Sequence, residues 1–132
     1  THQDANRLVS YTLNKCLNNE NFNCSEGKQF RDFLFVEDLI TAIVNCFDNK
    51  KALGQIINIG SGKPKKIKSV ILFIKNKIKL GKPLFGKLPL RDDEILTLYP
   101  EIKKAKKILN WKPLVSFNKG IDIITKYYKK PY

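Results

Sequence analysis

Three stretches of the chain place apolar residues three or four positions apart, which is the spacing of a helix that buries one face. These stretches are residues 4–18, residues 37–47 and residues 67–79. Asp4 is predicted to cap the first helix, because its carboxylate can accept hydrogen bonds from the free N–H groups of the first turn. Glu37 or Asp38 is predicted to open the second helix, where the helix dipole favours a negative charge.

The last third of the chain is predicted to contain two more helices. The segment EIKKAKKIL forms a short one, and Asn110 after it can adopt the left-handed conformation that ends helices. Ser116 is predicted to cap a terminal helix in FNKGIDIITKYYKK. We interpret Trp111, between these two helices, as a packing anchor.

Between the helices, short segments are predicted to be extended, and glycines and prolines predict turns. Residues 21–26 and the FLFV segment are expected to be short and extended, and QIINI (residues 55–59) is expected to be a buried strand. Gly60-Ser61-Gly62 then forms a turn, and GKPLFGKLPL (residues 81–90) is predicted to be a loop long enough to be functional. The alternation of helices and strands indicates an α/β fold.

Composition narrows the class of protein. A length of 132 residues suits one domain, and 42% apolar residues can build a core. The three cysteines show no C-x-x-C spacing, so we expect neither a metal site nor a disulfide scaffold, and a cytoplasmic location fits. No apolar run has membrane-spanning length. The absence of methionine predicts a piece of a longer polypeptide, with processing of a complete small protein as the alternative.

The formal charge of +13 suggests an acidic partner, and the few arginines suggest where it binds. Of 25 basic residues, only Arg7, Arg31 and Arg91 are arginine. A guanidinium offers a rigid fork of donors that fits phosphate or carboxylate with two bonds, which lysine cannot do. The alternative is that these arginines form surface ion pairs by chance, and composition alone does not separate the two.

Several apparent motifs do not hold. Tyr11 and Lys15 have Tyr-x-x-x-Lys spacing, but no dinucleotide fingerprint precedes them, so Tyr11 is expected in the core and Lys15 in solvent. GKPLFGK resembles a phosphate loop, yet Leu88 replaces the hydroxyl residue that binds magnesium. The Gly60 turn lacks the third glycine of a dinucleotide motif, and His2 stands alone.

A series of motifs, in order, resembles a known family. GKQFRDFLFVEDLITAI is similar to the G-x-x-x-RDF-x-x-V-x-D segment of the extended short-chain dehydrogenases/reductases that act on nucleotide sugars. INIGSGKP, LPLRDDEI, YPEIKKAKKILNWKP and SFNKGI follow in the family's order, and HQDANRLVSY resembles the stretch after its YGP tripeptide. The resemblance implies the C-terminal part of an extended Rossmann-type enzyme, in which helices are mixed with a few short strands.

The resemblance also implies roles for single residues. Arg31 and Arg91 would grip the diphosphate of the nucleotide sugar, and Glu94 would bond the ribose hydroxyls. Asn6 would lie near the sugar or the diphosphate, Asn23 falls in the stretch that lines the base, and Arg7 is a further candidate. Asp32 is expected to orient Arg31 or a turn, and Asp38 to cap its helix.

By the same resemblance, residues 1–132 are the substrate-binding portion, and a dinucleotide-binding portion with the catalytic Tyr-x-x-x-Lys is missing. The complete epimerase, dehydratase or 4-reductase would use NAD or NADP, which residues of this chain alone would not bind. The chain alone is expected to be inactive, and a homodimer of the complete enzyme stays open.

Two other classes of function compete with this interpretation. A small basic nucleic-acid-binding domain would fit the charge, although no aromatic and basic platform motif supports it. A non-catalytic interaction module would keep the fold, although it would not need Arg31 and Arg91. We therefore expect a nucleotide-diphosphate sugar as the ligand, and neither nucleic acid nor a membrane as a partner.

Overall fold

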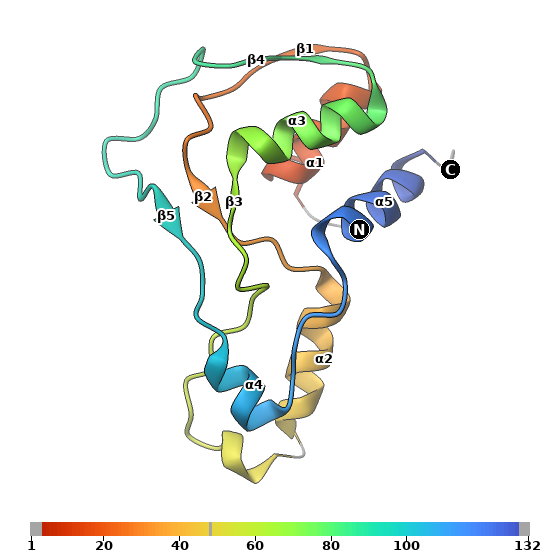
Figure 1. Cartoon of the computed structure of the whole chain (residues 1–132). Helices are drawn as coiled ribbons and strands as arrows, with labels where there is room; N and C mark the ends of the chain where they lie inside the picture. The colour runs from red at the N-terminus through yellow and green to blue at the C-terminus, as the bar shows by residue number, and fades with distance from the viewer. Residues whose placement is uncertain (1–3, 48, 130–132) are drawn as a thin grey trace. The chain divides into compact units, whose positions relative to one another are not determined.

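The structure is a computed structural model that describes residues 4–47 and 49–129, and it divides the chain into two compact units (Figure 1). The first unit comprises the chain up to Phe30, Lys65–Thr97 and the chain from Ile121 onward. The second comprises Arg31–Pro64 and Leu98–Gly120. Helices and short strands occur in both, so the predicted α/β class is confirmed. No helix in the described ranges is both long enough and apolar enough to cross a membrane.

The core of the first unit forms where α1 (Leu8–Leu17) packs on α3 (Ile67–Ile78). Apolar side chains at helical spacing fill the interface and remove their surface from water, which is the main stabilising contribution here. The buried apolar residues of the two helices are Leu13, Cys16, Val70, Ile71, Ile74 and Ile78. The amphipathic helix predicted for residues 67–79 is therefore confirmed.

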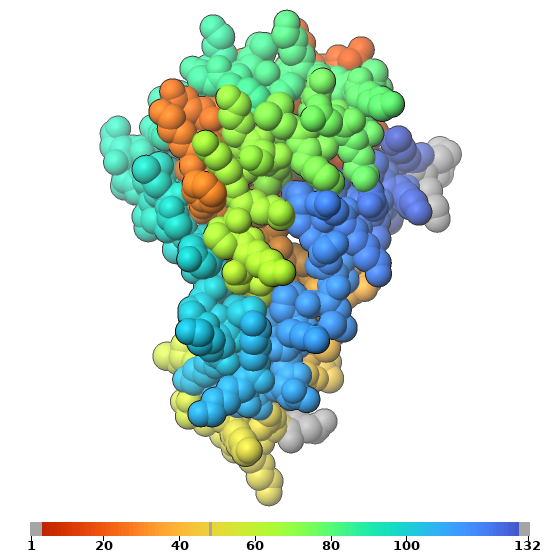
Figure 2. Space-filling model, in the orientation of Figure 1, coloured from red at the N-terminus to blue at the C-terminus, as the bar shows by residue number. Residues whose placement is uncertain are grey.

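A short parallel pair of strands lies beside these helices. Asn21–Asn23 (β1) pairs with Lys82–Leu84 (β4), with Phe22 opposite Pro83. Gly81, which leads into β4, has a φ of +77°, and a side chain there would meet the backbone of Cys16 at 2.7 Å. Only glycine therefore allows β4 to pass this close to α1. In Figure 2, α3 and the segment around β4 form neighbouring parts of one surface.

A second, three-stranded sheet has the order β3-β2-β5. Its strands are very short, and they are Lys65–Lys66 (β3), Phe30–Arg31 (β2) and Thr97–Leu98 (β5). Within the first unit, Phe30 N–H donates to the Leu96 carbonyl at 2.6 Å, and Ile67 N–H donates to the Gln29 carbonyl at 2.8 Å. These bonds fix the backbone on both sides of Gln29.

The second unit has a smaller core, built around Trp111. Val36–Phe47 (α2), the 3-10 helix Lys50–Ala52 and Lys103–Leu109 (α4) surround this residue. The buried cluster consists of Ala42, Ala105, Leu109 and Trp111. Trp111 is buried, and its Nε1–H donates to the Asp38 carbonyl at 3.0 Å, so its role as a packing anchor is confirmed.

Other predicted features of the second unit also hold. Asn110 ends α4 in the left-handed conformation, with a φ of 49°. Ser116 caps α5 (Phe117–Tyr128), because the Lys119 N–H donates to its Oγ at 3.3 Å. The Asp32 carboxylate accepts from the Ser61 N–H at 2.6 Å and from the Ser61 hydroxyl, so Asp32 orients the turn at Gly60.

Two predicted helix caps are wrong. The Asp4 carboxylate accepts from the Asn6 N–H at 2.9 Å, which makes a turn of residues 4–7 and delays the start of α1 until Leu8. Asp38 lies inside the first turn of α2, and its two carboxylate oxygens accept from the N–H groups of Leu114 and Val115, each at 3.0 Å. Asp38 therefore joins two distant segments and does not cap its own helix.

Two loop and strand predictions are also corrected. Residues 55–59 form no strand in the described part of the chain, because no neighbouring strand pairs with them there, and Ile56 is 86% exposed. An apolar run carries no information about its partner, so the sequence could not show this. Residues 81–90, predicted as a loop, contain β4, because pairing with β1 overrides the glycine and proline signals.

Candidate functional site

A cavity of about 430 Å³ opens within the first unit. This volume falls in the range of about 300–1,000 Å³ that is usual for small-molecule sites. Four separate stretches of the chain line it, and most of the lining side chains are apolar or uncharged. The lining residues are Asn6, Leu8, Tyr11, Thr12, Asn23, Cys24, Ser25, Gln29, Ile67, Ile71, Leu88, Pro89, Leu90, Arg91 and Glu94.

The end of β1 supplies one wall of the cavity, and backbone hydrogen bonds hold this wall in place. The Cys24 N–H donates to the Leu84 carbonyl at 2.9 Å, and the Cys24 carbonyl accepts from the N–H groups of Lys87 and Leu88. The strand end and the loop after β4 are therefore tied together where both reach the cavity. Asn23 and Ser25, on either side of Cys24, are among the lining residues as a result.

A glycine sets the turn that leads from this wall to Gln29. Gly27 has a φ of +66°, and a side chain there would meet the backbone nitrogen of Lys68 at 2.7 Å. Its carbonyl accepts from the Lys68 N–H at 3.0 Å, which ties the turn to the start of α3. The close approach explains why this position of the GKQFRDF segment is glycine.

The charged groups of the cavity come from the loop that follows β4. The Glu94 N–H donates to the Arg91 carbonyl at 3.1 Å, so the two residues stand at the ends of one tight turn. Both side chains belong to the cavity lining, where Arg91 is exposed and Glu94 is half-buried. The turn therefore presents a cation and an anion at the cavity.

The first helix, α1, supplies another part of the lining. Tyr11 packs edge-on against Phe22, with ring centroids 5.9 Å apart, and this contact fixes its ring next to the cavity. Thr12, on the same helix, and Ile71, on α3, are buried lining residues. This part of the lining is thus rigid, because it belongs to the packed interface between α1 and α3.

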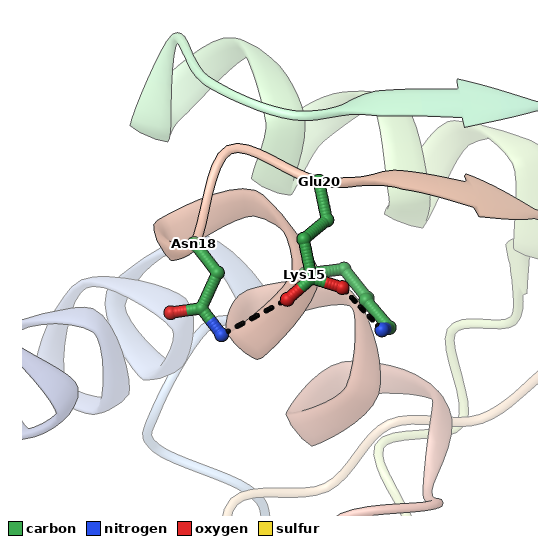
Figure 3. Close-up of polar contacts among 3 residues, drawn as sticks. All are labelled: Lys15, Asn18 and Glu20. Atoms are coloured by element: carbon green, nitrogen blue, oxygen red, sulfur yellow. Dashed lines mark hydrogen bonds and ion pairs between the residues drawn. The ribbon is translucent and has the colours of Figure 1, made fainter.

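The Lys15 ammonium pairs with Glu20 and also lies over the Tyr11 ring, with its Nζ 5.8 Å from the ring centroid. This ammonium donates to the Glu20 carboxylate, which also accepts from the Asn18 amide at 3.2 Å (Figure 3). These hydrogen bonds raise the pKa of Lys15 and lower the pKa of Glu20. Lys15 is not among the lining residues of the cavity, and a non-catalytic role for Tyr11 and Lys15 stays a prediction.

The thiol of Cys24 is a neutral part of the lining. Burial raises the pKa of Cys24 to about 11, and the nearby Cys16 adds to the shift. A thiol with this pKa is protonated at neutral pH and is a poor nucleophile. In the described ranges, no group of three or more His, Cys, Asp or Glu side chains is arranged to hold a metal ion.

The structure brings together four of the six residues predicted from the sequence. Asn6, Asn23, Arg91 and Glu94 all line this cavity, although they span almost 90 positions of the sequence. Arg7 precedes α1 and is not among the lining residues. Arg31 belongs to the second unit, so its role in a diphosphate clamp stays a prediction. His2 lies outside the described residues.

Sequence reasoning missed several lining residues. Gln29 stands inside the quoted GKQFRDF motif, and Leu88–Leu90 stand inside LPLRDDEI, so the motifs themselves were the signal. Tyr11 was assigned to the core, and it lies both in the core contact and at the cavity. Thr12 gave no signal, because only tertiary packing buries its hydroxyl.

Comparisons with known proteins identify the family. The family model described as GDP-mannose 4,6 dehydratase matches residues 3–124. CDP-abequose synthase of Salmonella typhimurium is 29% identical over 128 residues, which cover 92% of this chain and 42% of that protein. A putative UDP-glucose 4-epimerase of Methanocaldococcus jannaschii is 31% identical over 124 residues, which cover 92% of this chain and 39% of that protein.

A solved structure agrees with these matches. UDP-glucuronic acid 4-epimerase from Bacillus cereus, in complex with NAD, superimposes with a TM-score of 0.81 at 25% identity, covering 98% of this chain and 40% of that one. The chain therefore belongs to the nucleotide-sugar epimerase/dehydratase family of the extended short-chain dehydrogenases/reductases, and its fold is part of their Rossmann-type fold. It spans about two fifths of the length of these relatives.

Proposed function

We propose that this chain is the substrate-binding part of an NAD(P)-dependent nucleotide-sugar epimerase, dehydratase or 4-reductase. In this proposal the cavity of the first unit binds the nucleoside diphosphate. One observation carries it: Asn6, Asn23, Arg91 and Glu94, which the family resemblance assigns to the nucleotide sugar, line a single cavity of suitable volume.

The chemistry of these side chains suits the parts of such a ligand. The Arg91 guanidinium offers paired donors to diphosphate oxygens, and its exposure lets the charged phosphates keep contact with water. Glu94, at the other end of the same turn, can accept hydrogen bonds from ribose hydroxyls. Asn6 and Asn23 carry amides that both donate and accept, which suits sugar hydroxyls and base edges.

Arg31 completes the proposal as the second cation of the diphosphate clamp. The support for this assignment is its position in the RDF motif and the role that the resemblance gives to that arginine. Two arginines would neutralise the two phosphates and fix the ligand, so that its sugar is held in one orientation for reaction.

Hydride transfer belongs to another part of the proposed enzyme. NAD or NADP would accept and return a hydride at a sugar carbon, and the relatives' solved structures include complexes with NAD. The turn at Gly60 lacks the dinucleotide-binding motif, because Lys65 stands in place of the third glycine and Ser61 is bonded to Asp32. The contribution of this chain is to bind and orient the substrate.

We also propose that a dinucleotide-binding portion packs against the second unit. The relatives are more than twice as long as this chain, and α2 exposes a continuous apolar face. The exposed apolar residues of this helix are Val36, Leu39, Ile40, Ile43, Val44 and Phe47. A face of this kind normally contacts another part of a protein.

Calorimetric titration of the chain with CDP, UDP, GDP and dTDP at two salt concentrations tests the proposed ligand. We expect saturable binding of at least one diphosphate, and we expect Arg91→Ala to weaken it by about 1.5–3 kcal/mol, the usual contribution of a hydrogen bond to a charged group. Lys103→Ala, which removes one positive charge from α4 in the second unit, is the control and should leave the affinity within experimental error.

One result would contradict this proposal: all four diphosphates bind equally weakly, added salt abolishes the binding, and both variants have the same small effect. Binding would then be a non-specific attraction of anions to the lysine-rich surface. The proposed function would then be wrong.

A further inference from the structure

Two polar side chains that line the cavity lack a hydrogen-bond partner. The Thr12 hydroxyl and the Gln29 amide oxygen are buried, and no described residue bonds to either atom. Thr12 is 0% exposed and Gln29 is 9% exposed. Buried polar atoms without a partner are rare and destabilising in folded proteins, so a functional reason is expected for them.

Their location points to the cavity. The Thr125 hydroxyl is the third buried atom without a partner among the described residues, and Thr125 does not line the cavity. The other two belong to the lining, one on α1 and one in the segment before β2. Two independent elements thus each bring an unsatisfied polar side chain to the same cavity.

The residues that line the cavity differ in burial. Arg91, Asn6 and Asn23 are exposed, whereas Thr12, Cys24, Gln29 and Ile71 are buried. A diphosphate is strongly hydrated and belongs beside the exposed guanidinium of Arg91. A flat, largely apolar base can contact the buried lining residues, where it needs polar partners only along one edge.

We propose that Gln29 is a specificity-determining residue that reads the base of the nucleotide, with Thr12 as a second contact. This inference rests on the proposed function, because it assumes a nucleoside diphosphate in the cavity. The unsatisfied atom of Gln29 is its amide oxygen, which accepts hydrogen bonds and cannot donate them.

This acceptor favours one class of base. Cytosine presents an amino group at position 4, whereas uracil and thymine present a carbonyl oxygen there. In the orientation that the structure gives, the amide oxygen of Gln29 would accept from this amino group and would repel the carbonyl at position 4. The structure therefore assigns cytidine diphosphate, rather than uridine diphosphate, as the preferred nucleotide.

The same residue should affect stability and binding in opposite directions. Replacing a buried acceptor that has no partner by an apolar group of similar size is neutral or stabilising for the free protein. The replacement also removes the hydrogen bond to the base. A residue with a purely structural role would show the opposite change in stability, because its loss would lower the melting temperature.

The test compares Gln29→Met with Gln55→Met in the unmodified chain background. Gln55 is exposed in the second unit, so the second variant makes the same substitution away from the cavity. For the wild type we expect CDP to bind roughly tenfold more tightly than UDP, as for one hydrogen bond to a buried group. Gln29→Met should remove this preference, leave UDP binding unchanged and keep or raise the melting temperature. Gln55→Met should leave the preference intact.

A nuclear magnetic resonance titration of the wild type gives a readout that does not depend on the variant folding. The side-chain amide resonances of Gln29 should shift with CDP and stay in place with UDP at equal saturation. Those of Gln55 should not respond to either nucleotide.

The outcomes separate this inference from the proposed function. Equal binding of CDP and UDP, with Arg91→Ala weakening both, would overturn the role of Gln29 and leave the nucleotide site standing. Loss of CDP preference together with a lower melting temperature and unmoved Gln29 resonances would also overturn it. Failure of every diphosphate to bind, with no effect of Arg91→Ala, would overturn the nucleotide site itself.

Discussion

The two units of this chain differ in how much of their apolar surface they bury. In the first unit, α1 and α3 bury each other, and the largest fully buried side chains of the described structure, Leu13 and Ile74 among them, lie there. In the second unit the buried cluster is small, and Phe47 of α2 is 81% exposed. The first unit therefore holds its cavity with its own core, whereas the second leaves apolar surface in water.

The second unit compensates with polar bonds between distant segments. Asp38 accepts from two backbone N–H groups more than 70 positions away, and its carbonyl accepts from Trp111. Asn45 and Asn49 donate to the carbonyls of Leu109 and Ile108 at the end of α4. The first unit thus depends on apolar packing, whereas the second depends on a few hydrogen bonds between distant segments.

The largest effect is expected from the apolar core of the first unit. Leu13→Ala should lower the free energy of unfolding by about 2–5 kcal/mol. The Leu13 side chain is fully buried, so its truncation leaves a cavity in the core. Denaturant unfolding followed by circular dichroism measures this loss. Leu72→Ala on the outer side of α3 is the matched control and should cost much less. Equal losses for both variants would contradict the packed core.

A smaller effect is expected from the polar bonds of the second unit. Asp38→Asn should lower the free energy of unfolding by about 1.5–3 kcal/mol, because one of the two accepting carboxylate oxygens is replaced by an NH2 group, which cannot accept from a backbone N–H. Trp111 is the only tryptophan, so its fluorescence reports this unit directly. Glu37→Gln, on an exposed residue of the same helical turn, should change little. An equal loss from Glu37→Gln would show that helix-dipole charge, and not the distant bonds, is what matters.

The helices were the part of the fold that the sequence predicts well. Local sequence predicts the helices in residues 67–79 and 101–109. Asn110 and Ser116 are local signals for a helix end and a helix start. Local patterns fail where the outcome depends on a partner. The partner of Asp38 is 76 positions away, and nothing near residues 55–59 says whether a strand will pair with them.

In the candidate site, too, some residues could be predicted from local motifs, whereas others are shown only by the folded structure. Arg91, Glu94, Asn6 and Asn23 could be predicted because each stands in a motif of the family, and the structure places all four at one cavity. Gln29 stands in such a motif too. Its proposed role, however, depends on a buried amide oxygen without a hydrogen-bond partner, which is a property of the folded chain. Thr12 has no motif at all. Burial and hydrogen-bond satisfaction are tertiary properties, so sequence patterns do not report them.

The smallest expected effect concerns the three cysteines, whose thiols differ in burial between the two units. Cys16 and Cys24 are buried in the first unit, whereas Cys46 is half-buried in the second. Burial raises the pKa of both buried thiols, to about 11 for Cys24. Native alkylation with iodoacetamide at pH 8, followed by peptide mass spectrometry, should therefore modify Cys46 first and leave the other two thiols protected until the chain is denatured.

The same shift predicts how stability changes with pH. Below pH 9 the Cys24 thiol is protonated in both folded and unfolded chains, so it adds no pH dependence. Between pH 9 and pH 11 the unfolded chain loses this proton first, because its thiol keeps the ordinary value of 9.0, and the folded state becomes less stable as pH rises. Cys24→Val should flatten this part of the stability curve relative to the wild type, while Cys46→Val should not. Rapid native alkylation of Cys24, or an identical curve for both variants, would mean that the cavity wall of the first unit opens readily to water and lacks the rigidity that its packed core implies.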